Sequence, residues 1–352
     1  MSTRISEVVS RAEPTRAEAR RGGAEKERPR EITYLKAVSE ALWQEMERDE
    51  SVFILGEDVG VYGGAFKVTE GFIERFGPER VIDTPLTESG FIGAAIGAAM
   101  MGMRPVVEVQ YADFVSCGWD QIVNVAAKMH YRTRESVPMV IRGPSAAGVR
   151  AGPFHSQSPE AWFAHAPGLK VIVPATPADA KGLLKAAIRD NNPVIFFEPK
   201  YLYRRVKEAV PEGDYVVPIG KAKTAREGED ISVITYGTMV HRAIEAASLL
   251  QDNGISVEVI DIRTIYPLDR DAILDSVSKT GKAFVLTEDT LSYGISAEIA
   301  ATIVERSFEN LDGPVARLAP PDTPVPYSPP LEDFWLPQAA KIAEEIEKLV
   351  AY

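Results

Sequence analysis

The stretch ISVITYGTMVHRAIEAASLLQDNGISVEVIDI, residues 231–262, decides the fold class of this chain. Residues 231–236 are a β-branched, apolar run that predicts a buried strand. Residues 240–251 have the spacing of an amphipathic helix that ends before Gly254, and residues 257–262 predict a second buried strand. Strand, helix and strand make one βαβ unit, and its right-handed crossover places the two strands side by side in a parallel sheet.

The same alternation continues on both sides of this unit. On the N-terminal side, apolar runs predict strands at 51–55, 80–82, 105–110, 138–142, 170–173 and 193–198, and the helical pattern recurs at 88–101, 120–131 and 177–189. On the C-terminal side we expect strands at 283–287 and 315–318 and helices at 270–279, 295–308 and 338–350. The fold class is therefore α/β, with parallel sheets covered by helices on both faces.

The length and a change in composition divide the chain. At 352 residues it exceeds the usual size of one domain. We expect a first three-layer α/β domain at 31–205, a proline-punctuated linker at 206–218 and a second such domain at 219–352. Residues 1–30 hold eight bases and five acids without apolar periodicity, so they predict a disordered arm. This segment suits neither a secretory signal nor a transit peptide, and we expect a cytoplasmic protein.

The charge and the cysteine usage exclude several function classes. Lys and Arg number 39 against 51 Asp and Glu, and the formal net charge of −12 argues against nucleic acid or an anionic membrane as the main partner. The single Cys117 excludes an internal disulfide framework and a cysteine-based metal cluster. Residues 91–103 are apolar but too short to span a bilayer.

Glu88 is the first candidate for chemistry. It stands at a strand-to-helix junction in DTPLTESG, residues 83–90, where a carboxylate ordinarily interacts with the helix dipole. A stripe of small residues follows it (Gly90, Gly93, Ala94, Gly97 and Ala98), which lets another backbone approach. A carboxylate desolvated at such an interface would have a raised pKa and could exchange a proton with a heterocycle nitrogen. Both interpretations stay open at this point.

His155 is the second candidate. It lies in GPFHSQSP, residues 152–159, a loop with turn-forming residues on both sides, and loop histidines on rigid scaffolds are often functional. The glycines after the strand at 51–55 do not follow the GxGxxG spacing, which argues against a nicotinamide site. No group of carboxylates and histidines has the spacing of a zinc or iron site.

Several long motifs together carry a resemblance that extends from about residue 32 to the C-terminus. They are LGEDVG (55–60), GGAFKVTEG (63–71), RVIDTPLTE (80–88), FHSQSPE (154–160) and PGLKV (167–171). With these motifs the chain resembles the beta subunit of the decarboxylating first component of 2-oxo acid dehydrogenase complexes, the group that contains pyruvate, branched-chain 2-oxo acid and acetoin dehydrogenases. The resemblance implies a transketolase-like, pyrimidine-binding domain followed by a transketolase C-terminal-like domain.

The resemblance also implies a cofactor and its site residues. The cofactor is thiamine diphosphate, and Glu88 matches the family glutamate that hydrogen-bonds its aminopyrimidine ring. Glu57 matches a second acid near the cofactor, while Leu86 and Phe114 match positions that pack around the pyrimidine. His155 matches a loop histidine implicated in reductive acyl transfer to a lipoyl group.

The family further implies two cations and two protein partners. A potassium ion is expected on carbonyl oxygens at Met139, Ala187, Ile188, Asp190 and Asn192. The sequence contains no Gly-Asp-Gly motif, which thiamine enzymes use to hold magnesium and the diphosphate, so magnesium is expected on an alpha subunit. The implied assembly is a heterotetramer of two alpha and two beta subunits that serves a lipoyl-bearing acyltransferase component.

The sequence leaves the substrate open. We expect oxidative decarboxylation of a small 2-oxo acid with pyruvate as the first choice, and branched-chain 2-oxo acids and acetoin as alternatives. A noncatalytic assembly subunit is the alternative from a different class. Glu88 and His155 argue against it, since a scaffold needs neither residue.

Overall fold

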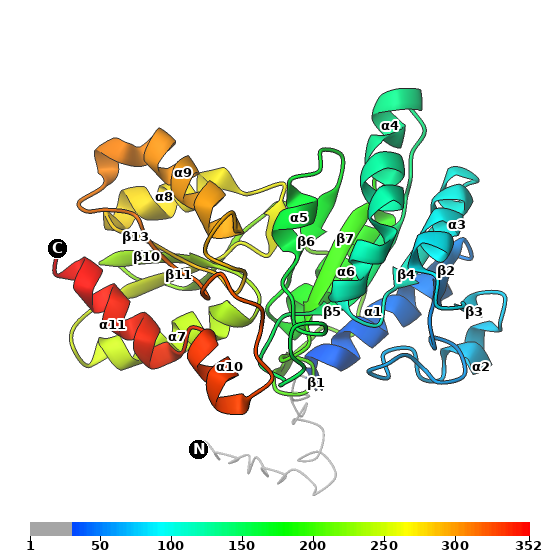
Figure 1. Ribbon diagram of the computed structural model, residues 1–352, viewed down its shortest axis with the longest axis horizontal. Coiled ribbons are helices and arrows are strands. Elements are labelled where there is room, and N and C mark those ends of the chain that lie inside the picture. The colour runs from blue at the N-terminus through cyan, green and yellow to red at the C-terminus, as the bar shows by residue number, and fades with distance from the viewer. Residues whose placement is uncertain (1–29) are drawn as a thin grey trace, which may run out of the picture.

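A computed structural model describes residues 30–352 of the chain. The predicted N-terminal arm, residues 1–30, therefore lies outside the described residues except for Arg30. In the part described, two sheets stand side by side along the longest dimension of the molecule, each with helices on both faces (Figure 1). The prediction of an α/β fold is confirmed.

The larger sheet has seven strands in the order β12-β6-β7-β5-β4-β2-β3. Its parallel strands are β2 (Val52–Gly56), β3 (Val81–Asp83), β4 (Arg104–Glu108), β5 (Val140–Ser145), β6 (Lys170–Ile172) and β7 (Val194–Pro199). Strand β2 pairs with both β3 and β4, so the segments that follow these three strands leave the sheet at one edge. That edge is where open parallel sheets form their binding sites.

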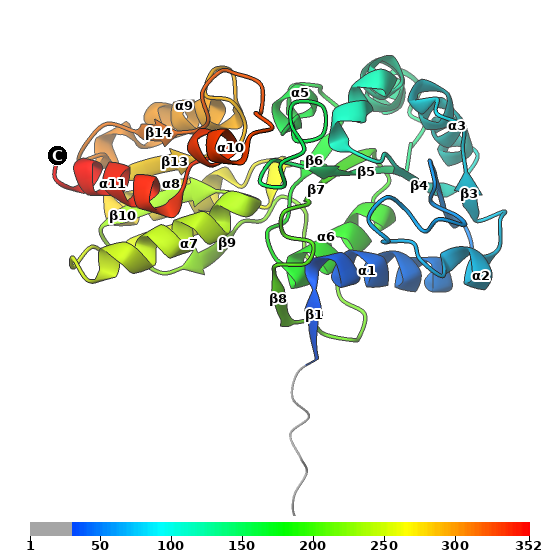
Figure 2. The same ribbon diagram turned by 60° about the horizontal axis from the view of Figure 1, so that its bottom comes forward.

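Helices cover both faces of this sheet, as Figure 2 shows. On one face lie α1 (Tyr34–Arg48) and α6 (Pro177–Arg189), whose buried apolar side chains pack together with those of the strands. On the other face lie α3 (Glu88–Met100), the short helices η2 (Ala112–Gly118) and α5 (Glu160–Ala164), and α4 (Ala127–Thr133). The helix expected at 120–131 begins with a wider, π-type segment, η3 (Gln121–Ala126), before α4 continues it. A further short helix, α2 (Phe72–Phe76), follows the glycine-rich loop.

The smaller sheet has five strands in the order β14-β13-β10-β11-β9. They are β9 (Lys223–Arg226), β10 (Ile231–Thr235), β11 (Val257–Asp261), β13 (Ala283–Leu286) and β14 (Ala316–Leu318). The predicted βαβ unit is confirmed, because β10 and β11 are parallel neighbours joined through α7 (Thr238–Gln251). Helices α7 and α11 (Ala339–Val350) pack on one face, while α8 (Arg270–Thr280) and α9 (Ile295–Ser307) pack on the other. The short η4 (Phe308–Asn310) and α10 (Pro329–Trp335) complete this half.

Two short strands form pairings that the sequence did not indicate. Strand β12 (Thr264–Tyr266) belongs to the C-terminal half, yet it pairs antiparallel with β6 and completes the larger sheet. Within residues 206–218, which we predicted as a linker, β8 (Lys207–Ala209) pairs with β1 (Glu31–Thr33). Farther along the same segment, the Tyr215 hydroxyl donates to the Ala178 carbonyl of α6 at 2.8 Å.

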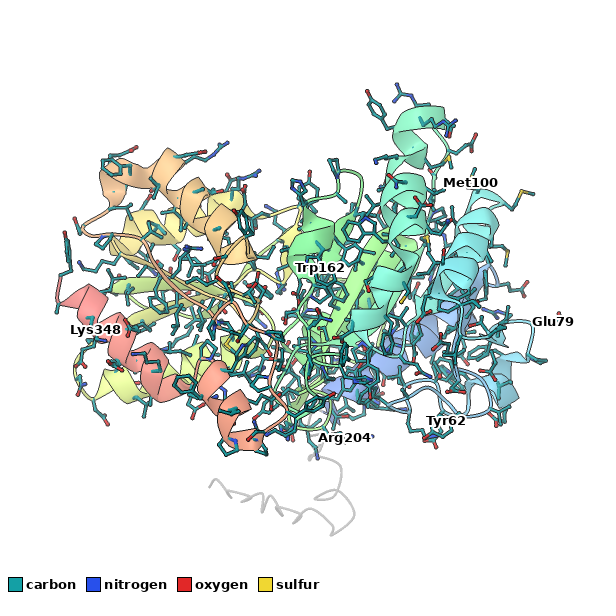
Figure 3. All side chains as sticks on the ribbon, viewed as in Figure 1. Tyr62, Glu79, Met100, Trp162, Arg204 and Lys348 are labelled. Carbon is teal, nitrogen blue, oxygen red and sulfur yellow. The ribbon has the colours of Figure 1, made fainter. Side chains whose placement is uncertain are left out.

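Side chains from both halves meet along the boundary between them. Figure 3 shows Trp162, on α5, at this boundary, whereas Lys348 and Met100 lie at opposite sides of the molecule. Among residues 30–352, no helix combines the length and the apolar character needed to cross a membrane.

Candidate active site

Glu57 and Glu88 leave neighbouring strands at the same edge of the larger sheet. Glu57 follows β2 directly, and Glu88 is the first residue of α3, which follows β3. Gly56 of β2 pairs with Asp83 of β3, so the segments that carry Glu57 and Glu88 leave the sheet next to each other. Gly56 itself must be glycine, since a Cβ there would stand 2.3 Å from the Glu108 carbonyl oxygen.

The two carboxylates lie close enough to affect each other. The Glu57 side chain is buried, and its Oε1 has no hydrogen-bond partner in the protein. Burial raises the pKa of Glu57, and the negative charges of Glu88 and Asp58 raise it further. Glu88 itself is partly exposed. A buried carboxyl with a free oxygen beside a more accessible one can exchange a proton with a ligand that enters here.

Helix η2 passes alongside the start of α3. A Cβ on Gly118 would lie 2.4 Å from Cδ1 of Ile92, so the glycine permits this close approach. Partial desolvation raises the pKa of the Cys117 thiol, and the charges of Glu88 and Glu57 raise it further, which places that end of η2 beside the carboxylates. The sequence analysis assigned no role to Cys117.

The other end of η2 carries Phe114 toward His155. The Phe114 and His155 ring centroids are 5.6 Å apart, and Tyr111 lies 4.4 Å from His155, both with edge-to-face geometry. Such contacts fix the orientation of the imidazole ring. Tyr111 is therefore a site residue that the sequence analysis missed, although its place just after β4 at the active edge of the sheet is a usable signal.

Asp113 holds the His155 loop against η2. Its Oδ1 accepts hydrogen bonds from the backbone N–H of Gln157 at 3.2 Å and from Nε2 of the same residue at 2.9 Å. The buried carboxylate thus fixes the loop two residues beyond His155. Sequence reasoning also missed Asp113.

Leu86 lies on the connection between β3 and α3, and 78% of its surface is exposed. This is unusual for a leucine two residues before the start of a helix. The structure thus gathers Glu57, Glu88 and Phe114 around η2, with His155 next to Phe114, and leaves Leu86 exposed two residues before Glu88.

A buried network of charged side chains joins β4, β5 and β7 near their carboxyl ends. The Arg142 guanidinium on β5 donates to both carboxylate oxygens of Glu198 on β7, at 2.6 and 2.7 Å, and also to Glu108 on β4. The Tyr203 hydroxyl donates to Glu198 at 2.6 Å. The network places one guanidinium between two carboxylates, and burial together with the charge of Glu198 raises the pKa of Glu108.

The residues predicted to hold potassium lie together at the opposite end of the strands. Ala187 and Ile188 lie in the last turn of α6, Asp190 and Asn192 follow in the connection to β7, and Met139 precedes β5. Four carbonyls already accept one hydrogen bond each: Met139 from Val194 N, Ala187 from Asp190 N, and Ile188 and Asp190 from the Arg104 guanidinium at 2.9 and 3.0 Å. A carbonyl oxygen has a second lone pair, so this oxygen-only set fits a hard cation, although Arg104 brings a competing positive charge.

Within residues 30–352, no three histidine, cysteine or acidic side chains come together in a way that could hold a metal ion.

Comparisons with known proteins place the chain in a family. Residues 30–206 match the transketolase pyrimidine binding domain, and residues 220–342 match the transketolase C-terminal domain. The chain is 52% identical to 2-oxoisovalerate dehydrogenase subunit beta of Bacillus subtilis, over 91% of this chain and 99% of that protein. It is 45% identical to the mitochondrial pyruvate dehydrogenase E1 component subunit beta-2 of Oryza sativa, over 98% of this chain and 93% of the other.

Two further comparisons agree with these. The beta subunit of an acetoin:2,6-dichlorophenolindophenol oxidoreductase from Cupriavidus necator is 46% identical, over 91% of this chain and 97% of that protein. A solved structure described as a split gene transketolase, inactive beta4 tetramer, superposes with a TM-score of 0.76 at 21% identity, covers 91% of this chain and 98% of its own, and shows the fold alone. The family matches and the long relatives at 45–52% identity agree on one conclusion: the chain belongs to the beta subunits of the thiamine-dependent 2-oxo acid dehydrogenases, which are oxidoreductases.

Proposed function

We propose that this chain supplies the beta half of an active site that oxidatively decarboxylates a small 2-oxo acid and transfers the acyl group to a lipoyl group of an acyltransferase component. The observation that carries the proposal is the pair Glu57 and Glu88. Oε1 of the buried Glu57 has no hydrogen-bond partner within the described residues, and the Glu88 carboxylate is partly exposed.

The residues at this edge fit the aminopyrimidine of thiamine diphosphate. Glu88 would accept a hydrogen bond from the ring or donate one to it, and Glu57 would use its free Oε1 beside it. Phe114 and the exposed Leu86 offer apolar surface for the ring faces. When bound, thiamine diphosphate supplies the carbon nucleophile of the reaction, while the protein holds it in place and moves protons.

The missing diphosphate anchor supports a partner subunit. We propose that an alpha subunit binds magnesium and the diphosphate, and that two alpha and two beta chains assemble so that the Glu57 and Glu88 edge faces the alpha subunit. The exposed Leu86 beside Glu88 supports this orientation, because large apolar side chains at a surface often mark an interface.

His155 would serve the second half of the reaction. Its ring is partly exposed and is held at its edges by Tyr111 and Phe114. A fixed and accessible imidazole can hold or donate a proton at the point where an acceptor group enters.

Potassium binding at the end of α6 is a further part of this proposal. If the carbonyls near Asp190 bind potassium, KCl raises the unfolding temperature more than LiCl at equal ionic strength. Two cations lie at this site, Arg104 and Lys170, which pairs with Asp190. The variant Arg104→Gln removes one of them and should strengthen this effect. Equal unfolding temperatures in both salts would refute potassium binding.

For the substrate, the identities favour a branched-chain 2-oxo acid, since the chain shares 52% of residues with the 2-oxoisovalerate subunit and 46% with the pyruvate subunit of the same bacterium. Pyruvate, the first choice from the sequence, is the second candidate because several pyruvate subunits match over nearly their full length.

The test is reduction of an artificial electron acceptor by the chain copurified with its alpha partner, with thiamine diphosphate and magnesium. Pyruvate, 2-oxoisovalerate and acetoin are compared at matched concentrations. We expect the highest kcat/KM with 2-oxoisovalerate. A stable complex that contains the cofactor but turns over none of the three would favour the noncatalytic assembly subunit instead.

A further inference from the structure

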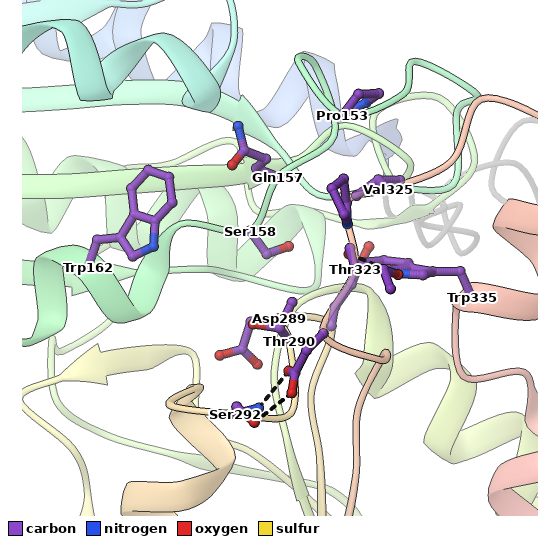
Figure 4. Close-up of a pocket in the computed structure, with 13 residues that line it drawn as sticks. Pro153, Gln157, Ser158, Trp162, Asp289, Thr290, Ser292, Thr323, Val325 and Trp335 are labelled. Atoms are coloured by element: carbon purple, nitrogen blue, oxygen red, sulfur yellow. Dashed lines mark hydrogen bonds between the residues drawn. The ribbon is translucent and has the colours of Figure 1, made fainter.

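A cavity of about 510 Å³ lies between the two halves of the described chain, apart from the Glu57 and Glu88 edge (Figure 4). One wall is the loop around Pro153, Gln157 and Ser158 together with Trp162 of α5. The other wall comes from the segment after β13 and from residues 322–325 and Trp335. Asp289 and Trp335 are buried, whereas Ser292 and Asp322 are exposed, so the cavity has a closed floor and an open mouth.

The lining of this cavity is negatively charged. It contains three carboxyl groups, Glu288, Asp289 and Asp322, and no lysine, arginine or histidine. Burial raises the pKa of Glu288 to about 7 and also raises the pKa of Asp289, so a bound cation would stabilise the ionised form of both. The nearby Lys200 ammonium is engaged by the backbone carbonyls of Ser145 and Ala146. Such a lining disfavours anions such as 2-oxo acids and favours cations.

Asp289 is the group that points to a ligand. Its Oδ2 accepts a hydrogen bond from the backbone N–H of Ile295 at 2.7 Å, at the start of α9. Its Oδ1 has no partner, although only 5% of the residue is exposed. The hydroxyls of Tyr236 and Thr287 lie beside the carboxyl and offset part of the rise in its pKa that burial causes. A buried, unpaired carboxylate oxygen is costly, and a bound cation would offset this cost.

The arrangement favours an organic cation over a metal ion. Among residues 30–352 no three acidic, histidine or cysteine side chains are placed to ligate one metal. Instead, two indoles line the cavity: Trp335, held by hydrogen bonds from its Nε1 to Thr323 O and Oγ1 at 3.2 and 3.1 Å, and the more exposed Trp162. Tryptophan faces attract ammonium and guanidinium groups.

We propose that this cavity binds a small organic cation, an alkylammonium or guanidinium compound, with Asp289 as its main anionic partner and the two tryptophans as apolar walls. The loop that forms one wall also carries His155, so the occupant contacts a segment of the candidate active site. The binding proposal does not depend on the proposed substrate or on catalysis.

The test uses the full chain and its tryptophan fluorescence, since Trp162 and Trp335 are two of its four tryptophans. The probes are tetramethylammonium, butylammonium and methylguanidinium chlorides, each titrated against NaCl and KCl at equal ionic strength, with sodium butyrate as the matched anion. We expect a saturable change with at least one organic cation and none with the alkali salts or butyrate. Hydrogen exchange at residues 153–158 should slow when that cation binds.

Two variants locate the binding. Asp289→Asn keeps an oxygen that can accept from Ile295 N and should weaken binding at least tenfold. Asp322→Asn, at the exposed mouth, should weaken it less and provides a second variant that leaves the buried floor intact. Asp275→Asn, an exposed acid on α8, is the control and should bind as the unaltered chain does.

A fluorescence change that does not saturate, or that NaCl or KCl reproduces, shows only an ionic-strength effect or an alkali-ion site. Saturable binding that Asp289→Asn and Asp322→Asn both leave unchanged places the cation elsewhere.

Discussion

The carboxylate of Glu88, at the first residue of α3, lies near enough to Glu57 that its charge adds to burial in raising the pKa of Glu57. The two residues come from segments that follow neighbouring parallel strands. The pKa of the buried Glu57 therefore depends on the charge of the more accessible Glu88. A ligand that binds Glu88 and changes this charge would also change the pKa of Glu57.

The first prediction concerns this link. Glu88→Gln removes the negative charge and should lower the pKa of Glu57, although burial keeps that pKa above the ordinary glutamate value. Carbon-13 NMR of labelled glutamate carboxyls measures the titration directly. Glu74→Gln, an exposed substitution on α2, is the control. The same Glu57 titration curve in both variants would show that the two carboxylates do not interact.

The second prediction concerns stability. A raised pKa means that the folded chain binds the Glu57 proton more tightly than the unfolded chain does, so Glu57 destabilises the fold increasingly as the pH rises above the ordinary glutamate pKa. Glu57→Gln removes this penalty and should therefore stabilise the protein at neutral pH. The gain should fall as the pH is lowered and vanish below about pH 3, where the carboxyl is protonated in both states.

Chemical denaturation at the two pH values checks this prediction. Glu70→Gln, an exposed substitution in the same loop region, should leave stability unchanged at both. A Glu57→Gln variant that is less stable than the unaltered chain at neutral pH would mean that the protein already satisfies the charged form.

The third prediction concerns the buried network of Arg142. Arg142→Ala leaves Glu108 and Glu198 buried without their cation and should cost roughly 3–5 kcal/mol in the free energy of unfolding. Adding Glu198→Gln should recover part of this loss. Arg270→Ala breaks an exposed pair with Glu298 and should cost about 1 kcal/mol or less. Similar losses for Arg142→Ala and Arg270→Ala in denaturant unfolding would contradict the role of burial.

The sequence predicted the elements whose pattern is local. Each strand of the βαβ unit at 231–262 is buried along its whole length, so its apolar run is uninterrupted and easy to recognise. Glu88 could be placed at a helix start because the residues on either side of it show where the strand ends and the helix begins. Glu57 was found only through a family motif, because its burial depends on strands far away in the chain.

The elements that the sequence did not predict depend on distant partners. Strand β12 has three residues, and its pairing with β6 joins segments about ninety residues apart, so no local pattern marks it. The same holds for β1 and β8. Tyr111 and Asp113 became site residues only when η2 was seen to contact the His155 loop.

The fourth prediction tests that contact. Asp113→Ala removes both hydrogen bonds to Gln157 and should speed hydrogen exchange in residues 152–158. In the complex with the alpha subunit it should slow acylation of a lipoyl domain more than reduction of an artificial acceptor. Asp113→Asn keeps an acceptor oxygen and should retain most of the loop protection. Unchanged exchange in Asp113→Ala would show that the loop is fixed by other contacts.

The most direct test of the whole account is the turnover of the Glu88→Gln variant in the copurified complex with thiamine diphosphate and magnesium. The proposed proton exchange at Glu88 predicts that reduction of the artificial acceptor falls by about 10²-fold or more, while Glu74→Gln keeps full activity. Turnover by Glu88→Gln equal to that of the unaltered complex would contradict the assignment of this carboxylate, and with it the proposed active site.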